Sequence, residues 1–363
     1  MNELESARKI INEVDRKMAK LFEERMEAVK TVAAYKKEHG IQVNDAAREA
    51  DVIRNNSKLM KNEEFKPYYV DFIQSNMDIS KNFQHRLLDG MRVAYSGVEG
   101  AFANIAAMRV FPDAVSVSYP DFKAAYKAAE TGECDCVILP IENSHNGDVS
   151  QVMDLIFFGG LFINGIYDIE VVHNLLAVKG TSMDQIKQVI SHPQALGQCA
   201  EYIRRHGFEC IECVNTAVAA KTVAESGRHD IAAIGSDEAA KKYGLKKLEA
   251  HINERSNNTT RFAVLSRNPK APSKKDKQFV MLFTVKNVAG ALGKAISIIG
   301  NNGFNLRALK SRPTKELIWS YYFYAEGEGN INSEKGEKML SELKKVCNDL
   351  RVVGNFEKEI TLR

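Results

Sequence analysis

Polar side chains stand in the first quarter of the chain where a plain helix bundle would not need them. They are Arg8, Arg25, Lys36, Asp45, Arg48, Glu49, Ser80 and Gln84. Any one of them could be an ordinary surface residue, and only the set as a whole indicates a site. Arginine binds carboxylates in a two-pronged geometry, and Ser80 and Gln84 lie four residues apart, on one helix face. The set therefore indicates a binding site for an anionic ligand.

A second group of polar residues lies in motifs where strands and helices meet. The motifs are Gly97-Val-Glu-Gly-Ala-Phe102, Pro140-Ile-Glu-Asn-Ser144, Ser191-His-Pro-Gln-Ala-Leu-Gly-Gln-Cys199 and Asn258-Thr-Thr-Arg-Phe262. Each contains good turn residues, so each taken alone could be a simple turn or helix cap. The glycine turn precedes a helix, where backbone amides can face an anion.

The elements that must position the first set are helices. Residues 1–88 are dense in helix formers, and apolar residues recur mostly three or four apart from Ile11 to Val32. This pattern predicts one helix from about Glu5 to His39, ended by Gly40 and ~50 Å long. Further helices are expected near 45–60 and 65–87. Since the long helix cannot bury its stripe alone, we expect a helical hairpin that dimerises along it.

The pattern changes twice after the helical section. From Met91 short β-rich runs alternate with helical stretches, which predicts an α/β fold. Residues 268–277, with two prolines among polar neighbours, read as a linker. The remainder has the βαββαβ order of a small α+β unit. The expected architecture is therefore multidomain, with an all-α domain at 1–88, a two-lobed α/β domain at 91–267 and an α+β domain at 278–363.

Composition excludes several classes of protein. The 363 residues carry 50 Lys and Arg against 47 Asp and Glu, a net charge of +3 that argues against a dedicated nucleic-acid binder. The longest apolar run, from Leu155 to Ile163, is half of the ~18 residues of a membrane span, and the start of the chain does not resemble a signal peptide. The six cysteines fit a reduced cytoplasm. Cys210 and Cys213 form a lone CxxC in a strand-like run, so we expect no metal there.

The helical section resembles the all-helical chorismate mutase family over its whole length, and the eight polar residues each match an active-site position of that family. The resemblance implies that chorismate, a dicarboxylate, rearranges to prephenate without a nucleophile, cofactor or metal. It implies that Arg25 binds one carboxylate and the partner subunit's Arg8 the other, while Lys36 and Gln84 donate to the ether oxygen. The remaining residues would complete the site: Glu49 at the substrate hydroxyl, Arg48 beside it, and Asp45 and Ser80 in the wall.

Residues 91–267 resemble prephenate dehydratase, to which the Pro-x-Glu-Asn-Ser, Ser-His-Pro-Gln-Ala and Thr-Arg-Phe motifs are specific. The resemblance implies two lobes around a cleft, as in periplasmic solute-binding proteins, and loss of carbon dioxide and a ring hydroxyl from prephenate to form phenylpyruvate. Thr260 would position or protonate the departing hydroxyl, and Arg261 would hold the lobes, while His192 is an alternative acid. The residues expected to line the cleft are Asn143, Ser144, Ser191, Gln198 and Thr216.

This section also departs from the common dehydratase pattern. Ala101 and Ala103 replace two hydroxyl residues of the glycine turn, and Asn215 replaces a serine. Plant arogenate dehydratases also carry alanine at the position of Ala101, and arogenate has an amine where prephenate has its side-chain keto group. Both substrates therefore stay open, with prephenate favoured because a mutase on the same chain makes it.

Residues 278–363 resemble the ACT domain, a regulatory amino-acid-binding module, through Gly290-Ala-Leu-Gly293 and Ser311-Arg-Pro313. The resemblance implies that L-phenylalanine binds between paired domains and inhibits dehydration. The residues expected around it are Gly290, Ala291, Leu292, Asn305, Leu306 and Ser311. Lys310 stands where the family usually has glutamate, which weakens the expected binding, and a docking domain without a ligand is the alternative.

Together the resemblances imply a cytoplasmic, bifunctional enzyme of phenylalanine biosynthesis, a homodimer or larger homo-oligomer that meets neither nucleic acid nor membrane. One rival is a ligand-sensing regulatory protein whose dehydratase-like cleft is inactive, because two hydroxyls are lost. Another is a monofunctional dehydratase with an inert helical arm, which leaves the complete mutase set unexplained.

Overall fold

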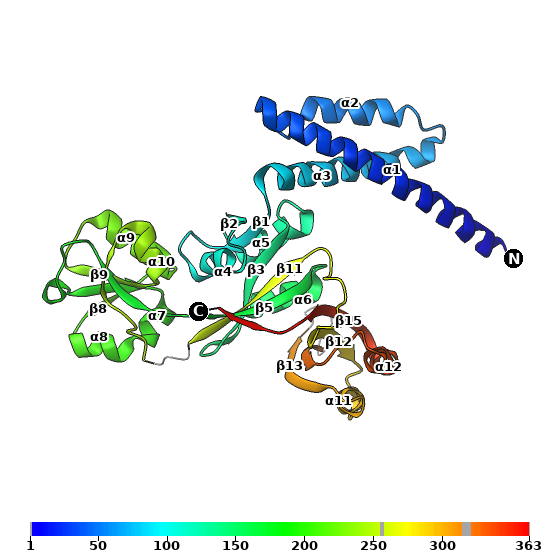
Figure 1. Ribbon diagram of the computed structural model, residues 1–363. Helices are drawn as coiled ribbons and strands as arrows, with labels where there is room; N and C mark the ends of the chain where they lie inside the picture. Colours follow the sequence, from blue (N-terminus) through cyan, green and yellow to red (C-terminus); the bar gives the residue numbers. More distant parts are fainter. Residues whose placement is uncertain (1, 255–257, 314–320, 363) are drawn as a thin grey trace. The chain divides into compact units, whose positions relative to one another are not determined.

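The computed structural model describes residues 2–254, 258–313 and 321–362. It divides into two compact units, Met1–Arg92 and Val93–Arg363 (Figure 1). None of the helices in the described part of the chain is long and apolar enough to cross a membrane.

The first unit is helical, with α1 (Glu3–His39), α2 (Ala46–Ser57), the short 3-10 turn η1 (Glu63–Phe65) and α3 (Lys66–Asp89). Asn2 begins α1 through a capping box with Glu5. Gly40 ends it with a left-handed φ of 64°, and its N–H donates to the carbonyl of Lys36. The predicted long helix and its glycine stop are confirmed.

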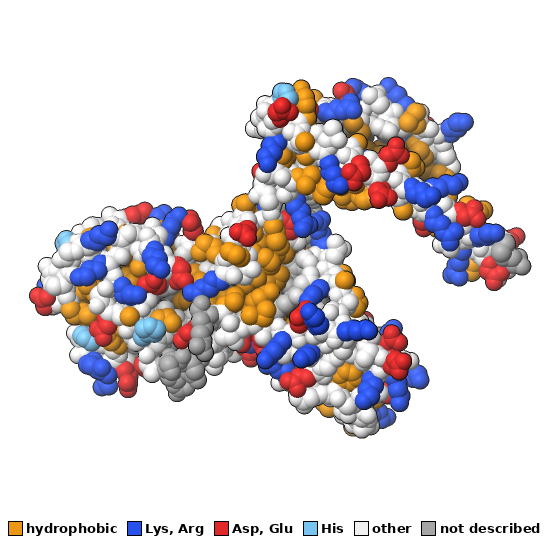
Figure 2. All heavy atoms as spheres, in the orientation of Figure 1, with side chains coloured by type: hydrophobic (Ala, Val, Ile, Leu, Met, Phe, Trp, Pro, Cys, Tyr) orange, Lys and Arg blue, Asp and Glu red, His pale blue; other side chains and the backbone are white. Residues whose placement is uncertain are grey.

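The apolar stripe of α1 stays uncovered within its own chain. Ile10 and Leu21 are 64% and 63% exposed, and the buried residue of α1 is Ala33. Figure 2 shows hydrophobic side chains among the charged ones on this unit. Exposed apolar stripes of this kind mark surfaces that meet another protein surface.

The second unit contains two lobes, each built on its own sheet. The first lobe consists of β1 (Arg92–Ser96), β2 (Val115–Tyr119), β3 (Cys136–Asn143), β4 (Gly147–Asp148), β5 (Phe162–Glu170) and β11 (Thr259–Ser266), with helices α4 (Phe102–Val110), α5 (Phe122–Thr131) and α6 (Ser150–Phe158). Because β11 returns from the second lobe to pair between β3 and β5, the chain crosses between the lobes twice.

The second lobe is a five-stranded sheet of order β10-β6-β9-β7-β8. Its strands are β6 (Asn174–Ala177), β7 (Gln188–Ser191), β8 (Glu209–Glu212), β9 (Ile231–Gly235) and β10 (Lys246–Glu249), and its helices are η2 (Met183–Gln185), α7 (Pro193–Gln198), α8 (Ala200–His206), α9 (Thr216–Ser226) and α10 (Asp237–Tyr243). The single helix expected over Ala195–His206 is wrong, because Cys199 leaves helical geometry with φ −119° and ψ 17° and divides it into α7 and α8.

The C-terminal section has the predicted βαββαβ order and a sheet of order β13-β14-β12-β15. Its elements are β12 (Gln278–Val285), α11 (Ala291–Asn301), β13 (Asn305–Pro313), β14 (Tyr321–Glu328), α12 (Glu334–Leu343) and β15 (Cys347–Phe356). The helix expected to reach Asn348 ends at Leu343, because the chain already enters β15 at Cys347, which pairs with Val285. The expected start of the third strand, Ile318, lies outside the described residues.

The C-terminal section also joins the first lobe, which the sequence did not predict. Gly354 of β15 pairs with Ile163 of β5, and a side chain on Gly354 would lie 3.0 Å from the Ile163 carbonyl oxygen. A last strand, β16 (Ile360–Leu362), pairs with β5 from Tyr167 to Ile169. The first-lobe sheet and the C-terminal sheet are thereby continuous, with eleven strands (Figure 1).

Candidate active sites

The helical unit brings Arg25, Ser80 and Gln84 together between α1 and α3. An Arg25 Nη donates to the Ser80 hydroxyl and, at 3.4 Å, to the Asn76 carbonyl. Both acceptors are neutral, and no described carboxylate lies within ion-pair distance of Arg25. Gln84 is buried, and its Oε1 has no hydrogen-bond partner among the described residues. The site thus holds an unneutralised cation and an unsatisfied amide, which suits an anionic ligand.

Three other predicted residues of this unit, Lys36, Asp45 and Glu49, have partners within the helical unit. Lys36 Nζ donates to the carbonyl of Val43 at 2.8 Å, and Asp45 caps α2 by accepting from the Arg48 N–H. Glu49 accepts from Lys81 Nζ at 2.9 Å. The sequence analysis missed Lys81, because a lysine on a charged helix carries no signal of its own.

Arg8 lies apart from these residues. At 1.5 Å per residue it stands about 25 Å from Arg25 along α1, and its side chain is exposed. Arg25 and Lys36, by contrast, are about three helical turns apart and share one face of α1. Within one chain, Arg8 therefore lies well away from the Arg25–Ser80–Gln84 cluster.

The second unit holds a cavity of about 550 Å³ that both lobes line. Of the predicted residues, Asn143, Gln198, Thr216 and Thr260 line it. The first residues of α4 and α9 line it as well, and no lining residue among those described is Lys or Arg. Because helix N-termini present free N–H groups and a partial positive charge, they can hold carboxylates here without a basic side chain.

A chain of hydrogen bonds runs along the cavity from Thr260. Asn143 Nδ2 donates to the Thr260 hydroxyl at 2.9 Å and to Asn258 Oδ1 at 3.0 Å. Asn258 Nδ2 in turn donates to Gln198 Oε1 at 2.8 Å, which also lies 2.9 Å from His173 Nε2. The chain fixes the Thr260 hydroxyl and connects the two lobes.

His173 was missed by the sequence analysis. It lines the cavity, is 2% exposed, and its Nδ1 has no partner among the described residues. Burial lowers its pKa, although the bond to Gln198 works in the opposite direction. A neutral imidazole therefore faces the cavity. In the sequence, His173 is a single histidine between two strand-like runs, and a histidine in such a place more often has a structural role than a binding role.

Three other predicted residues, Ser191, Ser144 and His192, make hydrogen bonds with backbone groups. Ser191 is fully buried and donates to the Ile234 carbonyl at 2.7 Å. Ser144 accepts from the Thr259 N–H at 3.0 Å. Neither hydroxyl lines the cavity, contrary to our expectation. His192 does line it, but its Nδ1 caps α7 by accepting from the Gln194 N–H, and burial lowers its pKa.

The residues expected to bind an amino acid lie on the surface of the C-terminal section. Gly290 begins α11 with φ 78° and is exposed. Ala291 and Leu292 follow in the first turn of α11, and Leu306 packs against the C-terminal core. Asn305 donates to Glu328, and Ser311 is exposed. In the described part of the chain, Gly290, Asn305 and Ser311 therefore lie at an exposed surface.

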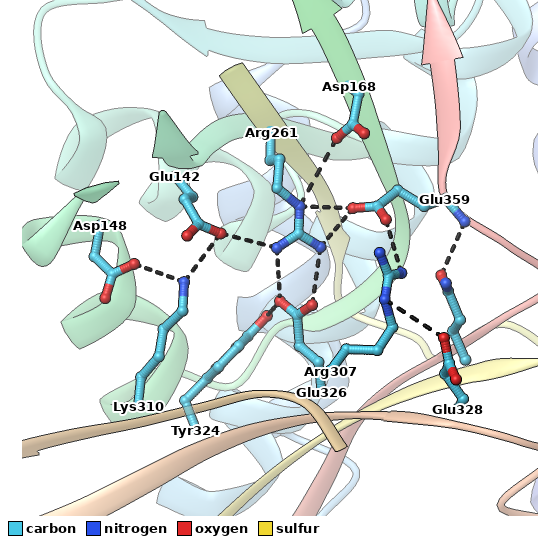
Figure 3. Close-up of polar contacts among 11 residues, drawn as sticks. Glu142, Asp148, Asp168, Arg261, Arg307, Lys310, Tyr324, Glu326, Glu328 and Glu359 are labelled. Carbon is cyan, nitrogen blue, oxygen red and sulfur yellow. Dashed lines mark hydrogen bonds and ion pairs between the residues drawn. The ribbon is translucent and has the colours of Figure 1, made fainter. Parts of the chain in front are cut away.

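Arg261 was expected to hold the two lobes, but it links the first lobe to the C-terminal section. Its guanidinium lies 2.9 Å from Glu142, 2.8 Å from Glu326 on β14 and 2.6 Å from Glu359 before β16 (Figure 3). Burial alone would lower the pKa of Arg261, but these carboxylates raise it. Burial likewise would raise the pKa of Glu142, and Arg261 and Lys310 lower it.

Asp168, at the edge of this cluster, predicts a measurable pH dependence. Burial and the charges of Glu359 and Glu326, partly offset by Arg261 and Arg307, raise its pKa from 3.8 to about 6. Between pH 3.8 and about 6, Asp168 therefore keeps its proton in the folded state and loses it in the unfolded state. The free energy of unfolding falls as pH rises through that window. Asp168→Asn should unfold at a higher temperature than the parent at pH 7 and at nearly the same temperature at pH 4. An equal difference at both values would contradict the shift.

Comparison with known proteins identifies the families that the two units resemble. The family described as "Chorismate mutase type II" matches residues 7–85, and the family described as "Prephenate dehydratase" matches residues 93–270. "Arogenate dehydratase/prephenate dehydratase 1, chloroplastic" of Arabidopsis thaliana is 32% identical, over 74% of this chain and 73% of its own. The "Bifunctional chorismate mutase/prephenate dehydratase" of Aquifex aeolicus is 29% identical over 99% of both. A solved prephenate dehydratase from Arthrobacter aurescens in complex with L-Phe is 25% identical, with a TM-score of 0.69 over 74% of this chain and 90% of its own.

Proposed function

This chain belongs to the family of bifunctional chorismate mutase–prephenate dehydratases, and on that basis we propose how its residues perform and regulate the two reactions. The first unit rearranges chorismate to prephenate, and the second dehydrates and decarboxylates prephenate to phenylpyruvate, the precursor of phenylalanine. The observation that carries the assignment of residues is the Thr260–Asn143 hydrogen bond inside the cleft, alongside the Arg25–Ser80–Gln84 cluster. A coupled assay from chorismate, which follows prephenate and then phenylpyruvate, tests the pair of activities.

In the mutase site Arg25 binds one carboxylate of chorismate, which replaces its present neutral partners. Lys36 and Gln84 donate to the ether oxygen as negative charge develops on it, and this differential stabilisation lowers the barrier of a reaction that needs no nucleophile. Glu49 accepts a hydrogen bond from the substrate hydroxyl, and Lys81 holds the Glu49 carboxylate in place. Arg48, Asp45 and Ser80 complete the wall.

The second carboxylate is bound by the partner subunit's Arg8. The exposed stripe of α1 supports a homodimer along this helix, and a second copy would bring an Arg8 to the site that holds Arg25. Arg8→Ala and Arg25→Ala should each be nearly inactive alone and should recover mutase activity when mixed, because a mixed dimer contains one site with both arginines. Mutase assays after verified subunit exchange measure this, and no recovery would exclude a shared site.

In the dehydratase cleft the N-termini of α4 and α9 hold the carboxylates of prephenate. Thr260, oriented by Asn143, hydrogen-bonds the departing ring hydroxyl. Aromatisation drives the loss of carbon dioxide, so the protein has to supply little more than orientation and one proton. Gln198 and Thr216 line the substrate, Ser144 and Ser191 support the walls, and His173 contacts the ligand as a neutral hydrogen-bonding group.

Arogenate is the second candidate substrate of this cleft. The Arabidopsis relative is named for both substrates, and Ala101 and Ala103 line the cavity where the common pattern has hydroxyls. Ala101 also begins α4 without a side-chain cap, which leaves N–H groups available to the ligand. Rates with prephenate and arogenate as competing substrates decide between them. Absence of turnover with either would favour the ligand-sensing regulator.

The C-terminal section is an ACT domain that binds L-phenylalanine between two copies. The Arthrobacter relative was solved in complex with L-Phe, which supports this amino acid as the ligand. Phenylalanine inhibits by binding one state of the dimer better than another, and a coupling of about 1–3 kcal/mol gives five- to 150-fold regulation. The six cysteines, none of them in a disulfide in the described part of the chain, support a reducing, cytoplasmic location.

Gly290→Val should abolish phenylalanine binding. The added side chain would project into the open space where the ligand is expected, and the left-handed φ of 78° disfavours a β-branched residue. Calorimetry should show heat with the parent and none with the variant, while dehydration without phenylalanine persists. If the parent binds no phenylalanine at millimolar concentration, the C-terminal section is a docking domain.

A further inference from the structure

Two carboxylates of like charge lie opposite each other in the hairpin that carries Asn143. In the β3–β4 ladder Glu142 lies directly opposite Asp148, and Asn143 opposite Gly147. Two carboxylates at directly opposed positions of an antiparallel pair repel each other. Asn143, Asn146, Gly147 and Asp148 all line the cavity. One wall of the cleft therefore depends on whatever compensates these two charges.

Lys310 supplies the compensation from the C-terminal section. Its Nζ lies 2.6 Å from Asp148 Oδ1 and 3.1 Å from Glu142 Oε2, between the two carboxylates (Figure 3). The side chain is 16% exposed and extends beside the ring of Tyr324. Arg261 also contacts Glu142, whereas Lys310 contacts both members of the pair.

The wider cluster makes this cation hard to replace. Glu326, Glu328, Glu359 and Asp168 lie close by and share Arg261 and Arg307. Carboxylates thus outnumber cations in this region of the described structure. Without Lys310, Asp148 would lie opposite Glu142 with no cation beside it. The repulsion would then favour opening of the β3–β4 hairpin.

We propose that Lys310 is a positioning residue for dehydration: it neutralises Glu142 and Asp148, holds the 143–147 hairpin closed, and thereby keeps Asn143 on the Thr260 hydroxyl. The proposal rests on the proposed roles of Thr260 and Asn143 in the cleft. It gives the C-terminal section a part in catalysis that is separate from binding of an amino acid. The position of Lys310 on β13 thereby connects the neighbourhood of Ser311 to the cleft wall.

A charge-swap cycle tests this in the full-length protein. Lys310→Glu places three carboxylates together and should lower kcat for phenylpyruvate formation about tenfold or more, within the range of measured couplings between contacting charges. Adding Asp148→Lys to it restores one cation between two carboxylates and should recover much of the loss. Asp148 lines the cavity, so the Asp148→Lys single variant is also measured to find the direct effect of this substitution on dehydration. Lys310→Arg keeps the charge and should retain most activity.

Two controls separate positioning from general damage. Mutase activity of the same chains should be unchanged, and their unfolding temperatures should show that every variant is folded at the assay temperature. Arg351→Gln is the matched interface control, because Arg351 bonds the carbonyls of Ile156, Phe157 and Gly159 at the far end of α6 and does not reach the hairpin. We expect nearly parental dehydration from this variant.

The outcomes distinguish this proposal from the proposed function. If Thr260→Ala abolishes dehydration while Lys310→Glu stays within about twofold of the parent, the role of Lys310 is refuted and the cleft assignment stands. Equal losses in Lys310→Glu and Arg351→Gln, or no recovery on charge swap, would show that Lys310 only attaches the C-terminal section. If Thr260→Ala keeps its activity, the assignment of the site itself fails.

Discussion

Thr260→Ala is expected to abolish phenylpyruvate formation while chorismate is still rearranged at the parental rate. The hydroxyl is the polar group at the end of the Asn143–Asn258–Gln198 chain, and its removal leaves nothing at that point to bond the departing ring hydroxyl. Loss of a positioned transition-state donor costs about two to three orders of magnitude in rate. Absorbance of phenylpyruvate, with prephenate supplied directly, measures the effect.

Thr260→Ser is the matched control, because it keeps the hydroxyl and removes only a methyl group. We expect this variant to retain much of the activity, with kcat reduced more than KM is changed. Equal rates for the alanine and serine variants would mean that the hydroxyl has no catalytic part, and attention would then turn to His173. That neutral imidazole also faces the cavity with one nitrogen unused among the described contacts.

Lys36→Ala should lower the mutase rate by about two to three orders of magnitude, because it removes a donor to the ether oxygen that is most needed in the transition state. The half-buried ammonium now donates to the Val43 carbonyl, a neutral partner that substrate can replace. Initial rates of chorismate consumption measure the loss. Dehydration of added prephenate should be unaffected, since it takes place in the other unit.

Lys37→Ala provides the control for this prediction. Lys37 is the next residue of the same helix, carries the same charge and is exposed, so its replacement changes net charge equally without touching the site. We expect parental mutase activity from it. A similar loss in both variants would indicate a general electrostatic effect on α1 and would remove Lys36 from the site.

Much of the local architecture follows from short-range signals in the sequence. The length of α1 and its stop at Gly40 result from residue spacing, helix propensity and one left-handed glycine, all of which act within a few residues. The βαββαβ order of the C-terminal section is visible for the same reason. The resemblance to prephenate dehydratase also placed Asn143, Gln198, Thr216 and Thr260 in one cleft, and all four line the cavity.

Other features depended on contacts between residues far apart in the chain. Arg261 meets Glu326 and Glu359, and Lys310 meets Asp148, only because β15 and β16 attach the C-terminal sheet to β5. A three-residue strand such as β16 has too little periodicity to be recognised. The sequence by itself thus determined the elements and the chemistry of the motifs. Only the tertiary structure decided which charges face each other, because ion pairs depend on distance in space and leave no pattern along the chain.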